Sequence, residues 1–143
     1  MSRPEPQGRD AYRHFTTVST RWSDNDAYGH VNNTIYYLWF DSAVNAYLVG
    51  VGLLDIGGGD PIGLVVQTEC AYFAPLSFPG DVEVGIAIDR LGGSSVTYRI
   101  GVFAAGSRET AAQGHFTHVY VSRETRRPVP LPEQWREQLK QLV

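Results

Sequence analysis

The sequence predicts an α+β domain in which a curled antiparallel sheet wraps around one long apolar helix, and two observations carry this prediction. Between Ile35 and Leu54 apolar residues follow one another almost without interruption, which is typical of a helix covered by other structure. From residue 62 onward, apolar and polar residues alternate in four successive segments. A period of two indicates strands with one buried face, and runs of strands beside a helix define the α+β class.

The elements can be placed in order along the chain. A first strand is expected between Tyr12 and Trp22, a polar loop follows, and the helix is expected to end near Gly50 and Gly52 because glycines interrupt helices. Four further strands are expected around residues 62–73, 82–89, 96–102 and 116–121. Short connections containing glycine or proline separate them, which favours antiparallel pairing.

Length and composition fit one globular domain. With 143 residues, 43% of them hydrophobic and 19% charged, the chain can bury a core of its own. The opening residues, MSRPEPQGRD, are polar, so residues 1–10 are predicted to form a flexible tail and residues 11–143 a single domain. The tail lacks the apolar run of a signal peptide, and no run of about 18 apolar residues occurs anywhere.

Charge and cysteine content narrow the possible partners. The formal net charge is −3 and the arginines are scattered, so we do not expect a nucleic acid as a partner. Because no apolar run is long enough to span a bilayer, we do not expect a membrane as a partner either. The single cysteine, Cys70, excludes an internal disulfide and a multi-thiolate metal site within one chain. We therefore expect a cytoplasmic protein without a bound metal.

The stretch RWSDNDAYGHVNN, residues 21–33, concentrates polar residues directly before the predicted helix. Asn32 and Asn33 are candidates for capping the helix, since an asparagine side chain accepts a hydrogen bond from the first free backbone N–H groups. Gly29 permits a backbone turn that other residues avoid. Capping and turn formation account for these three residues but not for the acids and the histidine of the stretch.

The acids of this stretch have more than one interpretation. The spacing of Asp24, Asp26 and Gly29 resembles a calcium-binding loop, but Tyr28 and Ile35 occupy positions where such a loop needs oxygen ligands. Asp26 is then either a turn-forming residue or a reactive carboxylate. The first turn of a long helix offers free N–H donors and a partial positive charge. A carboxylate beside it would face a bound carbonyl group, which is a geometry for acyl transfer.

The same stretch resembles a known family. The pattern D-x-D-x-x-G-H-V-N-N, followed by a tyrosine-bearing apolar helix with Asp41 in its middle, is similar to the hotdog-fold acyl-CoA thioesterases of the 4-hydroxybenzoyl-CoA thioesterase-like family. T-E-C-A-Y-F-A-P-L at residues 68–76 and R-R-P-V-P-L-P-E at residues 126–133 extend the resemblance over nearly the whole chain. It implies the hotdog fold, a sheet wrapped around a central helix.

The resemblance implies an enzyme that hydrolyses an acyl-CoA thioester to a carboxylic acid and free coenzyme A. Asp26 would be the nucleophile or the general base, and the backbone N–H of Asn33 would stabilise charge on the carbonyl oxygen. His30 would hold the loop or touch the substrate. No cofactor is implied, since coenzyme A is part of the substrate and then a product.

The resemblance also implies substrate contacts and an oligomer. Candidate substrate-binding residues are Tyr28, Gly29, Asn32, Tyr36 and Glu69, although core packing is the simpler explanation for Tyr36 and an exposed strand position for Glu69. Members of the family form dimers and often tetramers with the substrate between subunits, so a homodimer or homotetramer is expected.

Two alternatives stay open. Hotdog domains also act as hydratases and dehydratases on acyl thioesters, and a fold alone does not determine function. A non-catalytic domain that binds acyl-CoA would keep the fold without turnover. The acid-bearing loop before the helix favours the hydrolase, because hydratases of this fold typically place their catalytic acid and histidine elsewhere.

Overall fold

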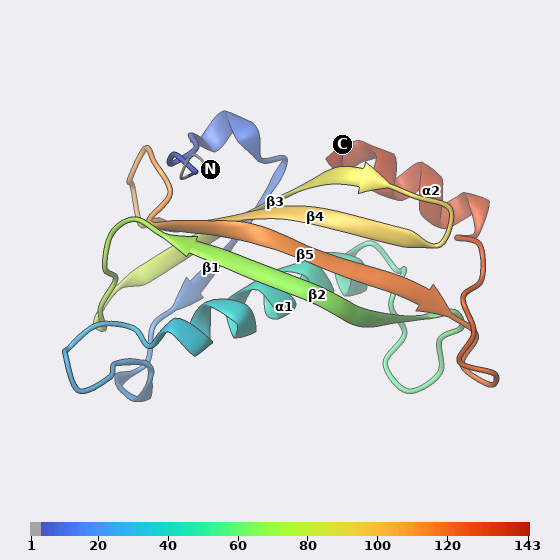
Figure 1. Cartoon of the computed structure of the whole chain (residues 1–143), viewed down its shortest axis with the longest axis horizontal. Helices are drawn as coiled ribbons and strands as arrows, with labels where there is room; N and C mark the ends of the chain where they lie inside the picture. Colours follow the sequence, from blue (N-terminus) through green and yellow to red (C-terminus); the bar gives the residue numbers. More distant parts are fainter. Residues whose placement is uncertain (1–3) are drawn as a thin grey trace.

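The computed structural model describes residues 4–143, which form a curled five-stranded antiparallel sheet with two helices (Figure 1). In chain order the elements are β1 (His14–Ser19), α1 (Asn33–Gly50), β2 (Ile62–Tyr72), β3 (Asp81–Leu91), β4 (Ser95–Ala104), β5 (Ala112–Val121) and α2 (Glu133–Leu139). The strand order in the sheet is β1-β3-β4-β5-β2, and each neighbouring pair is antiparallel. Within the described residues, neither helix combines the length and hydrophobicity needed to cross a bilayer.

The strands follow the predicted alternation of apolar and polar residues. The register places Ile86 opposite Ile100 and Ile100 opposite Gly114. Because side chains alternate between the two faces along each strand, these three positions lie on the same face of the sheet. We call the face that packs against α1 the inner face and the opposite one the outer face. Val84 and Ile100 on the inner face are completely buried, because they belong to the same apolar cluster as the helix.

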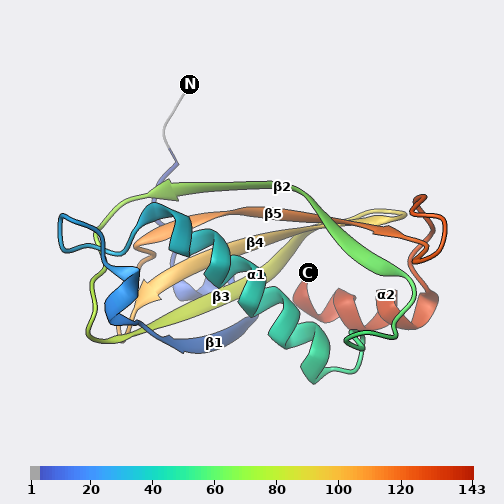
Figure 2. The same cartoon turned by 90° about the horizontal axis from the view of Figure 1, so that it is seen from below.

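Helix α1 lies across the inner face of the sheet (Figure 2). Its buried residues recur every three or four positions, the spacing that places them on one side of a helix: Tyr36, Trp39, Phe40, Ala43, Val44, Tyr47 and Leu48. The other side is uncovered, and Leu38 and Val49 are 46% and 45% exposed. The expectation of a helix enclosed on all sides is therefore wrong for a single chain, because the sheet covers only one side of α1.

The second helix, α2, was not predicted from the sequence. Its end contributes Leu139 to the same core as α1, and the guanidinium of Arg136 donates hydrogen bonds to the carbonyl oxygens of Gly92 and Gly93 at 3.0 and 3.2 Å. Seven residues are too few for a helical period to stand out in a sequence. Packing at the end of the sheet, rather than intrinsic propensity, explains a helix of this length.

The segment before β1 covers part of the outer face. The backbone N–H of Gln7 donates to Gln113 at 3.0 Å, and the ring of Tyr12 packs over Gly101, where a Cβ atom would lie 2.5 Å from the tyrosine hydroxyl. Only glycine leaves room for the ring there. Residues 1–3 of the predicted tail lie outside the described residues, and the division of the chain at residue 10 stays a prediction.

Candidate active site

Asp24 serves the structure of the polar loop. It is 1% exposed, and its carboxylate accepts hydrogen bonds from the backbone N–H and the guanidinium of Arg21, both at 2.8 Å. Its carbonyl oxygen accepts from the backbone N–H of Asn32 at 2.8 Å. These bonds join the start of the loop to the residue that precedes α1. Both carboxylate oxygens of Asp24, the first acid of the D-x-D pattern, therefore have hydrogen-bond partners.

Asp26 shapes a turn with one carboxylate oxygen and leaves the other uncommitted. Oδ1 accepts from the backbone N–H of Tyr28 at 2.8 Å and, at a longer 3.4 Å, from that of His30. Gly29 closes the turn with a φ of +78°, a conformation that favours glycine. Among the described residues, Oδ2 has no hydrogen-bond partner. The turn-forming interpretation thus holds for one oxygen, and the second stays available for chemistry.

The start of α1 presents a free donor beside this carboxylate. The side chain of Asn32 accepts from the backbone N–H of Thr34 at 2.9 Å, which confirms the capping predicted for Asn32. Asn33 is the first residue of α1, so its N–H has no acceptor within the helix and lies at the positive end of the helix dipole. The Tyr72 hydroxyl donates to the Asn33 carbonyl at 3.1 Å, which joins the end of β2 to the first residue of α1.

A cavity of about 380 Å³ lies between the polar loop, the first turn of α1 and the end of β2. Of the residues predicted to form the site, four line it: Asp26, His30, Asn33 and Tyr36. The remaining lining residues are Val31, Tyr72, Phe73, Ala74 and Pro75. The structure therefore brings the candidate carboxylate and the candidate oxyanion donor to one cavity within a single chain.

The end of β2 and the segment that follows it form one wall of the cavity, and the sequence indicated no role for them. Tyr72 and Pro75 belong to the T-E-C-A-Y-F-A-P-L stretch, whose resemblance to the family was the available signal. The segment also braces the loop, since the backbone N–H of Val31 donates to the carbonyl of Leu76 at 2.7 Å and the Ser77 hydroxyl donates to the carbonyl of Gly29 at 2.9 Å. No local pattern indicated that this segment reaches the start of α1.

Desolvation raises the pKa of two tyrosines that line the cavity. Desolvation raises the pKa of Tyr36 to about 12 and raises the pKa of Tyr72 still further, so both hydroxyls keep their protons at neutral pH. Burial likewise raises the pKa of the nearby Cys70 thiol to about 11. A thiol with such a pKa is a poor nucleophile.

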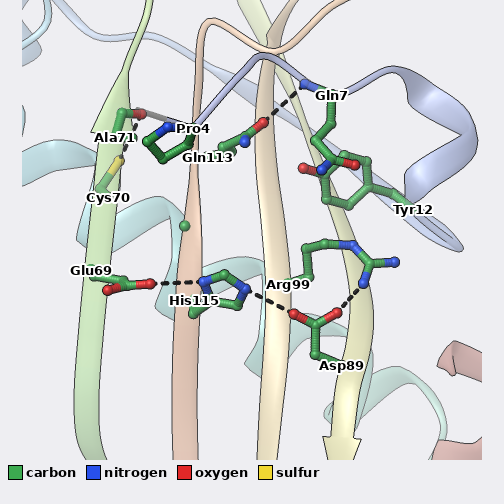
Figure 3. A pocket seen from close by; sticks show the side chains of 11 residues that line it. Pro4, Gln7, Tyr12, Glu69, Cys70, Ala71, Asp89, Arg99, Gln113 and His115 are labelled. Atoms are coloured by element: carbon green, nitrogen blue, oxygen red, sulfur yellow. Dashed lines mark hydrogen bonds and ion pairs between the residues drawn. The ribbon is translucent and has the colours of Figure 1, made fainter. Parts of the chain in front are cut away.

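Four predicted binding residues do not line this cavity. Tyr28, Gly29 and Asn32 lie in the adjoining loop and cap, and Tyr28 is 85% exposed. Glu69 lies on the outer face of β2, where its Oε1 is 2.8 Å from Nδ1 of His115 and where it lines a different cavity (Figure 3). Within one chain, Glu69 is thus separated from Asp26.

The sequence and the fold both match a known protein superfamily. Residues 20–139 match the family model of the thioesterase-like superfamily, and the chain belongs to this superfamily. Its curled sheet with the helix on the inner face is the hotdog fold implied by the sequence resemblance.

Individual proteins show how far the similarity extends. The chain is 51% identical to the PA5185 protein of Pseudomonas aeruginosa strain PAO1, with a TM-score of 0.93 and 96% of each chain covered. The PA2801 protein of the same species, described as a thioesterase candidate, is 30% identical, with a TM-score of 0.80 and coverage of 89% of this chain and 98% of that one.

Two proteins of lower sequence identity are also similar, the first in structure and the second in sequence. Slr0204 of Synechocystis, a 1,4-dihydroxy-2-naphthoyl-CoA thioesterase, is 20% identical, with a TM-score of 0.79 over 88% of this chain and 94% of that one. The uncharacterized protein YsmA of Bacillus subtilis is 23% identical over 137 residues, which are 95% of this chain and 91% of YsmA.

Proposed function

We propose that the protein is an acyl-CoA thioesterase, which hydrolyses an acyl-CoA thioester to a carboxylic acid and free coenzyme A. The observation that carries the proposal is the pairing of Asp26, with one uncommitted carboxylate oxygen, and the N–H of Asn33 along one cavity. Membership of the thioesterase-like superfamily supports it. The name of Slr0204 adds that a protein of this fold acts on a CoA thioester.

In the proposed mechanism, the thioester carbonyl oxygen accepts a hydrogen bond from the Asn33 N–H, and the positive end of α1 stabilises the charge that develops on this oxygen. Oδ2 of Asp26 acts in one of two ways. It attacks the carbonyl carbon, expels the CoA thiolate and leaves an anhydride that water then hydrolyses. Alternatively, it takes a proton from the water that attacks the carbon. In both routes the thiolate leaves with the bonding electron pair and is protonated afterwards.

The other candidate residues take supporting roles in this proposal. His30 and Tyr36 form part of the cavity wall, where they would contact the acyl group or the thioester. Tyr28, Gly29 and Asn32 stand beside the opening on the loop, within reach of a larger substrate. Coenzyme A enters as part of the substrate and leaves as product, so the proposed reaction uses no further cofactor.

We further propose that the active unit is a homodimer, or a homotetramer built from such dimers. Strand β2 is an edge strand, and its Leu64, Val65 and Val66 are 38%, 48% and 59% exposed. Apolar side chains on both faces of an unpaired edge favour pairing with another strand. The uncovered side of α1, with Leu38, adds apolar surface that a second copy would bury.

The test is release of CoA from short, medium, long and aryl acyl-CoAs, with the wild type beside Asp26→Asn and Asp26→Ala. We expect kcat/KM to fall by about 10³-fold in both variants, with the fold retained in Asp26→Asn because the amide oxygen still accepts from Tyr28. Glu124→Gln, which neutralises an exposed acid outside the cavity, serves as the matched control and should keep full activity.

The outcomes separate the candidate functions. Full turnover by Asp26→Asn would contradict the proposed chemistry. If no substrate releases CoA although acyl-CoA still binds, the protein would be an acyl-CoA-binding domain and not a hydrolase. Hydration of an enoyl-CoA in the same assay would favour a hydratase instead.

A further inference from the structure

A second cavity, of about 390 Å³, lies on the outer face of the sheet, away from α1. Its base is formed by β2, β5, β4 and β3, and Pro4 and Gln7 of the N-terminal segment lie over it (Figure 3). The volume falls within the range of small-molecule sites. We call it the outer cavity and the cavity at the start of α1 the helix-start cavity.

One side of the outer cavity is a row of four side chains from four neighbouring strands. His115 lies between two carboxylates, with Nδ1 2.8 Å from Glu69 Oε1 and Nε2 2.8 Å from Asp89 Oδ2. The other oxygen of Asp89 accepts from Arg99. The row thus joins two carboxylates through an imidazole and a guanidinium.

The other side of the outer cavity holds a buried hydroxyl without a partner. Tyr12 is 4% exposed, and its hydroxyl makes no hydrogen bond within the described part of the chain. Desolvation raises the pKa of Tyr12 to about 12, so the hydroxyl keeps its proton and is available as a donor. The ring of Tyr12 packs on Gly101, and Tyr12 is among the residues that line the cavity (Figure 3). Buried polar atoms are normally paired, so one that is not calls for an explanation.

The N-terminal segment holds a second polar group in place. The backbone N–H of Gln7 donates a hydrogen bond to the side-chain oxygen of Gln113, and the side-chain amide of Gln113 donates to the carbonyl of Glu5 at 2.9 Å. These bonds fix the segment over the sheet through its backbone and leave the Gln7 side-chain amide unpaired among the described residues. Between the two polar sides, Pro4 and Ala71 offer apolar surface.

We propose that the outer cavity binds a small uncharged organic molecule that carries both a hydrogen-bond acceptor and a donor, as an amide does. The acceptor takes the proton of the Tyr12 hydroxyl, the donor meets the Gln7 amide oxygen or the second oxygen of Glu69, and the apolar body lies against Pro4 and Ala71. An anion is disfavoured because the carboxylates of Glu69 and Asp89 line the cavity, and a cation is disfavoured because the guanidinium of Arg99 lines it as well. The inference does not depend on the proposed thioesterase activity.

Three probes that share one ring test the proposal: benzamide, benzoate and benzylamine. They are titrated into the ¹⁵N-labelled full chain and followed by backbone amide chemical shifts. We expect benzamide to shift the amides of Gln113 and His115 but not those of Asp26 and Asn33, and to bind at least tenfold more tightly than the two charged probes. Tightest binding by benzoate or benzylamine at these residues, or benzamide shifts confined to the helix-start cavity, would overturn the proposal.

Tyr12→Phe removes only the unpartnered hydroxyl and keeps the ring on Gly101. We expect benzamide to bind about tenfold more weakly to this variant, while thermal unfolding occurs at the wild-type temperature or above, because no internal hydrogen bond is lost. Gln7→Ala, an exposed substitution, provides a second variant with weakened binding. Tyr28→Phe is the matched control with unchanged affinity. Equal benzamide affinity in wild type and Tyr12→Phe, or no benzamide binding at its solubility limit, refutes the site.

Discussion

The helix-start cavity and the outer cavity have nearly equal volumes, about 380 and 390 Å³, but are built in different ways. The first is formed by a loop, one helix turn and the end of an edge strand. The second lies on four adjacent strands, with a segment of the same chain above it. A site on a loop and a sheet edge can change with assembly, whereas a site on neighbouring strands is organised by the register of one chain.

Among the changes that separate the two cavities, the largest effect is expected from breaking the proposed contact between two β2 edges. Val66 is 59% exposed and lies at a register shift, between Val65 and Gln67, where it has no partner on β5. We expect Val66→Lys to yield single subunits in analytical ultracentrifugation and to lower CoA release at least a hundredfold, the order of loss that misplaced catalytic groups cause. Benzamide affinity at the outer cavity should stay unchanged.

Val66→Thr, similar in size and uncharged, is the control for this substitution and should remain assembled. Full turnover by single Val66→Lys subunits would show that the helix-start cavity is complete in one chain, and the contrast between the two cavities would disappear.

The next effect distinguishes the two acids of the loop. Asp24→Asn leaves the guanidinium of Arg21 without its buried carboxylate, so we expect the free energy of unfolding to fall by about 2 kcal/mol, less than for a fully buried pair because Arg21 is 58% exposed. Asp26→Asn should change it by less than about 0.5 kcal/mol. Urea unfolding of both variants measures the difference. Equal losses would mean that Asp26 is as structural as Asp24.

Acid should destabilise the whole fold, and with it both cavities, because the buried His118 resists protonation in the folded chain. Burial lowers the pKa of His118 from 6.5 to about 4, so between these values the unfolded chain takes up a proton that the folded chain does not. Stability is therefore unaffected by His118 above pH 6.5 and falls as the pH drops below it, by about 1.5 kcal/mol at pH 5.5.

His118→Phe should remove this part of the acid sensitivity, since the ring lies among Phe116 and Tyr120 with centroids 4.9 and 5.8 Å away and phenylalanine does not titrate. Urea unfolding at pH 7.5 and 5.5 checks the slope. An unchanged slope in the variant would show that His118 is not the group responsible.

The smallest effect concerns the bond between β2 and the first peptide of α1. Tyr72→Phe removes the donor to the Asn33 carbonyl but keeps the ring, which packs edge-on against Tyr36 with centroids 5.0 Å apart. We expect kcat to fall about fivefold with KM nearly unchanged, because the variant keeps the Asn33 N–H but loses a hydrogen bond that holds this first residue of α1 in position. A rise in KM with unchanged kcat would instead assign Tyr72 to substrate binding.

The sequence predicted the strands well because burial of one face forces a period of two. It was less accurate at their ends. The first strand, expected from Tyr12 to Trp22, spans His14–Ser19, because Tyr12 packs on the outer face and Trp22 lies in a 3₁₀ turn capped by Arg21. Both are aromatic residues whose places are determined by tertiary contacts that a local pattern does not contain.

The candidate site was predictable where its residues are close in sequence. Asp26 and Asn33 are seven positions apart, so a cap and a loop suffice to place them near each other. The position of Tyr72 beside Asn33, and of Glu69 beside His115, depends instead on how β2 pairs with β5 and passes the start of α1. Tyr12 gave no signal at all, because a tyrosine near a strand is ordinary until its hydroxyl is found buried without a partner.

The exposed edge of β2 also bears on how the protein behaves while it is being made. A newly folded chain presents three consecutive apolar side chains, Leu64, Val65 and Val66, on a strand that forms the edge of the sheet in the described part of the chain. Such an edge is a template for irregular sheet growth and aggregation. Overproduction that outpaces pairing should send chains into inclusion bodies, and slower synthesis or a charged residue at this edge should raise the soluble yield.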